Sequence, residues 1–271
     1  MTAPLALASR LLPPLLLLAP PFALLLAMHV AARALARQSQ QLFGHRLQLI
    51  LFAWLGTIVH EGSHAVACVL FGHRVHRIRW FDPQATNGSL GSVEHSYRRG
   101  SLYQQVGNVV IGLAPLLAGA LVIVVAAQQL VGLSPPVAHA AGLASSLSSL
   151  SSPSWPTVSG WMTTGRDIAR DISPWRGAAF VFICLSVGGS MHLSASDVRG
   201  TLRGALVLAV GVVVALLAIP LLATWPWFSA AALVVSAWGA LCLNALVLAL
   251  IITAIGALSL WAIRVALAPR R

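Results

Sequence analysis

The sequence has little charge, few acids and no lysine. Only 8% of its 271 residues are charged, whereas 58% are hydrophobic. A typical soluble domain carries about 25% charged residues. The apolar residues also gather in blocks of roughly 18 or more, which is long enough for a helix to cross a bilayer. This composition argues against a soluble domain and predicts an all-α polytopic membrane protein.

Cysteine is also scarce. Cys68, Cys184 and Cys242 lie far apart inside apolar segments, so no disulfide framework is indicated. The 17 basic residues are all arginines and outnumber the six acids, giving a net charge of +11. Such an excess can indicate nucleic-acid binding. In a chain this apolar we attribute it to arginines beside membrane spans, so we expect the lipid bilayer as a partner and no nucleic acid.

About six transmembrane helices are predicted, with a membrane-associated β-hairpin after the second. The apolar segments are 11–32, 47–72, 104–131, 177–193, 202–224 and 229–263, and a short polar linker is expected at 38–46. Prolines interrupt the first segment, which favours a retained helix over a cleaved signal. Three parts follow: an N-terminal helix and linker (1–46), a three-helix core (47–204) with a surface loop at 132–176, and two C-terminal helices with a basic tail (205–271).

The second apolar segment carries the motif His60-Glu61-Gly62-Ser63-His64. Residues four apart leave a helix on the same face. H-E-x-x-H on a helix is therefore typical of zinc hydrolases, in which two imidazoles bind the metal and the carboxylate takes a proton from metal-bound water. The plainer alternative is that both histidines only bond neighbouring carbonyl groups. Ionisable groups inside an apolar helix indicate a functional site.

Several residues are candidates for a third ligand. Asp197 is the only acid in the last 100 residues, and His192 competes with it. Ser194-Ala-Ser-Asp197 also fits a capping box, which is the structural alternative for Asp197. Cys68 follows His64 by one turn and is a conceivable ligand, although a small packing residue is the preferred interpretation.

The segment 73–99 alternates polar and apolar residues around Asn87-Gly88, which predicts the hairpin. Its edge could bind an unwound substrate strand, or the segment could be an ordinary interfacial loop. His95 and Asn108 are candidate oxyanion or substrate contacts. A solvated loop for His95 and a helix-packing hydrogen bond for Asn108 are the alternatives.

Six spans place both termini, the hairpin and Asp197 on one side of the membrane. That side holds eleven of the 17 arginines. The positive-inside rule then predicts a multi-pass cell-membrane protein with cytoplasmic N- and C-termini. The same parity makes the second and fourth segments run in one direction, which brings Asp197 toward the histidine pair.

The chain resembles the site-2 protease family of intramembrane zinc metalloproteases. The resemblance rests on His60 to His64, the hairpin-like segment, the Gly112-Leu-Ala-Pro115 run and the later Asp197. It implies that His60, His64 and Asp197 hold Zn²⁺ and that Glu61 is the catalytic acid and base. In the family the aspartate usually precedes glycine, whereas Val198 follows Asp197 here.

The predicted function is hydrolysis of peptide bonds in transmembrane protein substrates by metal-activated water. Zinc with three protein ligands keeps one position open and lowers the pKa of its water to about 7. One alternative is a non-proteolytic zinc-binding membrane scaffold or partner-binding protein. A transporter or channel ranks lowest, because the sequence lacks the internal repeats common among transporters.

Overall fold

A computed structural model describes most of the chain. The described residues are 3–85, 90–132, 172–191, 194, 197–201, 204 and 226–267, with side chains described outside 3–22 and 226–241. The elements are α1 (Ala3–Gln48), a π-helical stretch η1 (Leu49–Ala53), α2 (Trp54–Leu70), β1 (Arg74–Arg79), β2 (Ser92–Ser96), α3 (Leu102–Val131), α6 (Pro174–Ser190) and α8 (Pro226–Leu267).

The mostly helical fold with one small hairpin is confirmed. Three described segments are long and apolar enough to cross a membrane, namely Ala23–Leu70, Leu102–Val131 and Cys242–Leu267. The count of six spans stays a prediction, because the segment 202–224 and most of the loop 132–176 lie outside the described residues.

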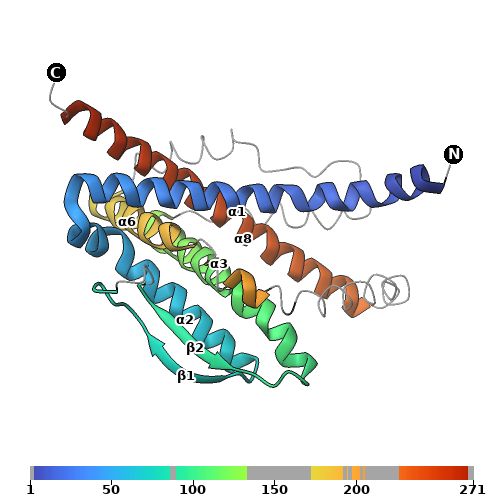
Figure 1. The fold of residues 1–271 in the computed structure, drawn as a ribbon. Coiled ribbons are helices and arrows are strands. Elements are labelled where there is room, and N and C mark those ends of the chain that lie inside the picture. The colour runs from blue at the N-terminus through green and yellow to red at the C-terminus, as the bar shows by residue number, and fades with distance from the viewer. Residues whose placement is uncertain are drawn as a thin grey trace.

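The prediction of a polar linker at 38–46 is wrong, because α1 continues to Gln48. Its residues are mostly glutamine, arginine and leucine, which favour helices. The interruption is confined to Gly44, whose φ of 76° and ψ of 169° are not helical. In Figure 1 the chain turns back at this end of α1, and α2 then runs away from the bend.

The helices pack around two apolar clusters. α2 packs against α3 and α6, and α8 packs against α1, α3 and α6; all five helices are visible in Figure 1. The larger cluster joins α1, α3, α6 and α8 through buried side chains that include Met28, Ile123, Phe180, Val187 and Ala249. The smaller cluster joins α2 and α3 beneath the hairpin.

Large apolar side chains also cover the outside of the helices. Val69 is 71% exposed, and Leu117, Leu121, Ile255 and Leu258 are also exposed. A contiguous apolar exterior is unfavourable in water but is the surface that lipid tails solvate. Together with the three long apolar helices, this exterior indicates a membrane protein.

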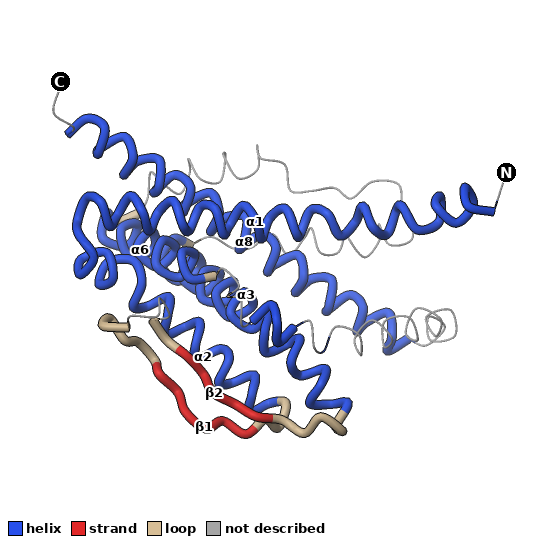
Figure 2. The backbone as a smooth tube through the Cα atoms, viewed as in Figure 1, coloured by secondary structure: helices blue, strands red, loops and turns tan. Residues whose placement is uncertain are grey.

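The hairpin lies along the outside of α2. β1 and β2 pair antiparallel, with Val75 opposite His95 and a register shift between Val75 and Arg77. Figure 2 shows both strands beside α2, and both strands contact that helix. The tip that holds Asn87 and Gly88 lies outside the described residues.

Candidate metal centre

The two motif histidines converge on one face of α2. Their Nε2 atoms lie 3.2 Å apart. The ring centroids are 4.9 Å apart and the planes meet at 74°. Two ring nitrogens that face each other at this distance can bind the same ion.

Each imidazole is fixed by a backbone carbonyl from another helix. The Nδ1 of His60 lies 2.8 Å from the carbonyl oxygen of Ser190, at the end of α6. The Nδ1 of His64 lies 2.8 Å from the carbonyl oxygen of Ile111 in α3. Because a carbonyl oxygen only accepts hydrogen bonds, both Nδ1 atoms carry the proton, and both Nε2 lone pairs are left for a metal. The histidines thus bond carbonyl groups, as the plainer alternative expected, and still converge.

Asp197 completes the cluster. Its Oδ1 lies 3.2 Å from Nε2 of His64, and its Oδ2 lies 3.6 Å from Nε2 of His60. Zinc–ligand bonds of about 2.0 Å in tetrahedral geometry separate neighbouring donor atoms by about 3.3 Å. The three side chains therefore fit a zinc ion. His192, the competing third ligand, lies outside the described residues.

The capping box at Asp197 is also present. The Asp197 carboxylate accepts the backbone N–H of Ser194 at 2.7 Å, and the N–H of Asp197 donates to Oγ of Ser194 at 3.2 Å. One carboxylate oxygen thus caps a helix while both oxygens face the histidines. The Asp197 side chain therefore both caps the helix and faces the histidines, two roles that the sequence alone leaves as alternatives.

A glycine allows Asp197 to reach the histidines. The helical turn at 197–201 passes α3 at Gly112, where a Cβ atom would collide with Oγ1 of Thr201 and lie 2.9 Å from the carbonyl oxygen of Asp197. Any side chain at Gly112 would therefore push this turn away. The same α3 helix supplies the Ile111 carbonyl that orients His64, so α3 sets the positions of two members of the cluster.

Glu61 is buried between α2 and the hairpin. Its side chain is within electrostatic range of His60, His64 and Asp197. The hairpin touches it at Gly91, where an added Cβ atom would lie 2.5 Å from Cγ of Glu61. Glu61 therefore lies beside the metal-binding cluster and is covered by Gly91, the residue that precedes β2.

The other candidate residues lie elsewhere. Asn108 is buried in α3, and its amide nitrogen lies 3.4 Å from the carbonyl oxygen of Gln104, one turn earlier. His95 on β2 faces His73, with their Nδ1 atoms 3.1 Å apart. Burial, followed by the neighbouring His73, His64 and His76, lowers the pKa of His95. Cys68 lies with His73 and His95 rather than with the first cluster.

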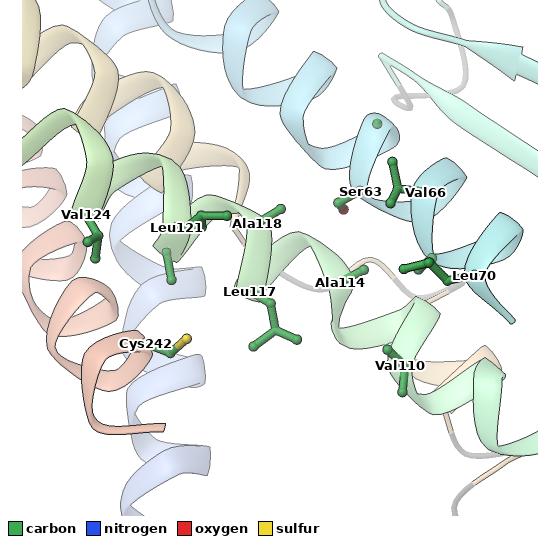
Figure 3. A pocket seen from close by; sticks show the side chains of 13 residues that line it. Ser63, Val66, Leu70, Val110, Ala114, Leu117, Ala118, Leu121, Val124 and Cys242 are labelled. Carbon is green, nitrogen blue, oxygen red and sulfur yellow. The ribbon is translucent and has the colours of Figure 1, made fainter. Parts of the chain in front are cut away.

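An apolar groove lies beside the later half of α2, and Figure 3 shows the side chains that line it. It has a volume of about 700 Å³, lies between α2 and α3 and reaches Cys242 of α8. The lining includes Ser63, Val66, Leu70, Ala114 and Leu117. Gly62 and Ser63 of the motif line the groove, whereas His60, Glu61, His64 and Asp197 are not among its described lining residues.

A histidine pair, a carboxylate and an adjacent glutamate are the residues typical of a metallopeptidase site. A family model described as Peptidase M50B-like matches residues 22–158, which include His60, Glu61 and His64. The match covers half of the chain, and the protein belongs to this family. The resemblance to site-2 proteases is thereby confirmed. No curated protein and no solved structure matches the chain.

Proposed function

We propose that this protein is an intramembrane zinc endopeptidase. One observation carries the proposal: the Nε2 atoms of His60 and His64 and the carboxylate of Asp197 converge beside Glu61. His60, Glu61 and His64 lie in a segment that is apolar enough to cross a membrane. Family membership makes a peptidase the expected activity.

The residues of the chain have separate roles in this scheme. His60, His64 and Asp197 would hold Zn²⁺, which when bound acidifies a water molecule and polarises the scissile carbonyl. Glu61 accepts the proton of the attacking water and passes it to the departing amine. The carbonyls of Ser190 and Ile111 keep the two imidazoles oriented throughout.

The proposed substrate is a transmembrane segment of another protein. The groove beside α2 is open and apolar, and its volume of about 700 Å³ supports the proposal that it accepts part of a helix from the lipid. The peptide must unwind before cleavage, because a helical carbonyl is hydrogen-bonded and shielded. The hairpin contacts Glu61 through Gly91, which supports pairing of the unwound segment with a strand edge. We retain the multi-pass topology with cytoplasmic termini as part of this proposal.

The test compares two glutamates. Glu61→Gln keeps the shape of the side chain but cannot take up the proton, so cleavage of a tagged transmembrane segment in liposomes should fall about 10²- to 10⁴-fold. Zinc content should be unchanged. Glu94→Gln is the matched control, because Glu94 is exposed on β2 and should leave cleavage intact.

Undiminished cleavage by the Glu61→Gln variant would reject the scheme. A wild-type protein that binds zinc but cleaves no membrane segment in proteoliposomes or cells would favour the non-proteolytic scaffold instead.

A further inference from the structure

A second cluster of metal-type ligands lies at the end of α2. One donor atom each from Cys68, His73 and His95 lies within 4.8 Å of the others. Cys68 is fully buried and His73 is 5% exposed, while His95 is half-buried on β2. The cluster shares no residue with His60, His64 and Asp197, so it is a separate site.

The turn that ends α2 brings Cys68 and His73 together. The N–H of His73 donates to the carbonyl of Cys68 at 2.8 Å, and the N–H of Gly72 donates to Val69 at 3.1 Å. This is a Schellman motif, and Gly72 has the positive φ of 67° that it needs. The motif places its sixth residue against its first, a contact that is usually hydrophobic. Here that contact pairs a thiol with an imidazole.

The hairpin brings the third donor. Val75 lies opposite His95 in the ladder, and His73 is two residues before Val75 on the same side. His73 and His95 are therefore diagonal neighbours within side-chain reach. The ring of Tyr97 stacks on His73 with centroids 5.2 Å apart, which further restricts the orientation of His73.

The hydrogen bonds of His73 indicate that the nitrogen facing His95 carries a lone pair. Its Nε2 lies 2.9 Å from the carbonyl oxygen of Gln104 and must donate, so Nδ1 is unprotonated. That Nδ1 lies 3.1 Å from Nδ1 of His95, close to the roughly 3.3 Å between ligands of a tetrahedral zinc ion. A hydrogen bond between the rings accounts for the two nitrogens alone, whereas a metal ion would also bind the Cys68 sulfur, which lies within 4.8 Å of both histidine donor atoms.

We propose that Cys68, His73 and His95 form a second zinc site, which fixes the hairpin to the end of α2. A thiolate and two imidazoles are ligands that zinc favours. These three side chains would hold the ion and leave its fourth position to a ligand from outside the cluster.

The site has a structural consequence for Glu61. His95 is four residues after Gly91, the residue that packs on Glu61. Fixing His95 to α2 would therefore fix β2, and with it Gly91, which packs on Glu61. This second ion would act on positioning and would not take part in proton transfer.

Cobalt substitution separates the two sites by their ligands. Apoprotein in detergent, prepared with a chelator, is titrated with Co²⁺. A thiolate ligand gives an intense sulfur-to-cobalt charge-transfer band in the near ultraviolet, which nitrogen and oxygen ligands do not give. Because His60, His64 and Asp197 offer no sulfur, the band reports the second site alone.

We expect the band in wild type and in His60→Ala, and its loss in Cys68→Ala. Cys184→Ala and Cys242→Ala are matched controls, because these cysteines lie outside both metal-ligand clusters, and they should keep it. Added zinc should displace the band. A failure of Glu61-dependent cleavage would leave this result unaffected, so the two proposals fail separately.

Cobalt that binds wild type without the band, or a band that persists in Cys68→Ala, would overturn the second site. Cys68 also packs with Ala67, Ile111 and Ala114, so its replacement could disturb folding. His95→Ala, at a half-buried strand position, is the second variant. It should remove one zinc ion per chain, and unchanged zinc content would contradict the proposal.

Discussion

Two histidine clusters share α2, and they are assembled in different ways. The first joins the middle of α2 to a carboxylate more than 130 residues later, and each of its histidines is oriented by a carbonyl from a different helix. The second forms around the turn after α2 and one hairpin. Its residues, from Cys68 to His95, are at most 27 positions apart in the sequence. Only the first contains an H-E-x-x-H motif on a helix, with Glu61 between its two histidines in the sequence.

The way in which each cluster is assembled indicates the role that it can have. A site built from several helices depends on how closely those helices pack, and it can be shaped around a substrate. A site built from one turn and one hairpin forms with its local structure and stabilises that structure. These differences support the proposed division of roles, in which the first cluster would carry catalysis and the second would position the hairpin.

The largest effect is expected from a substitution that disrupts the first cluster. His64→Ala should abolish zinc binding there and lower cleavage by at least about 1,000-fold, because a catalytic metal supplies several kcal/mol. Cys68→Ala, one turn further along α2, should lower cleavage about tenfold at most, in the range of outer-shell changes. Cleavage rates of both variants in one liposome assay make the comparison. Equal losses would remove the distinction between the two clusters.

A smaller effect should follow from separating the helices of the first cluster. Gly112→Ala adds a Cβ atom where Thr201 and Asp197 pass, and such overpacking costs about 1–3 kcal/mol. We expect a lower unfolding temperature in detergent and weaker zinc binding.

Gly200→Ala is the control for that variant, because nothing lies within 4 Å of a Cβ atom at Gly200. Its zinc affinity and unfolding temperature should match wild type. If Gly112→Ala behaved the same way, α3 would not set the position of Asp197.

The smallest effect concerns the cap. Ser194→Ala removes the hydroxyl that accepts the N–H of Asp197, which costs about 1 kcal/mol. The backbone N–H of Ser194 still binds the Asp197 carboxylate. Zinc affinity, measured with a competing chelator, should therefore fall about tenfold. Ser96→Ala, on exposed β2, is the control, and an equal fall there would show that the cap does not orient Asp197.

The sequence predicted the parts of the site that depend on spacing. The interval between His60 and His64 fixes a shared helix face, and the direction of the spans brought Asp197 toward them. The carbonyls of Ser190 and Ile111 could not be predicted, because every residue has a backbone acceptor and its use leaves no side-chain signal. They become visible only when α3 and α6 are placed against α2.

The remaining differences have local causes. A polar composition at 38–46 was interpreted as a linker, yet glutamine and arginine continue a helix readily. The pairing of His73 with His95 depends on the turn at Gly72 and on the shifted register after Val75. A hairpin can be predicted from alternation and a turn, but its register depends on packing against α2.

The most direct test of the zinc centre is the zinc affinity of Asp197→Ala. If the carboxylate from the distant helical turn binds the metal, the affinity of the first site should fall at least about 100-fold, measured in a Cys68→Ala background that lacks the second site. Asp82→Ala, at an exposed pair with Arg79, should bind zinc as wild type does. Undiminished zinc binding by Asp197→Ala would contradict the account.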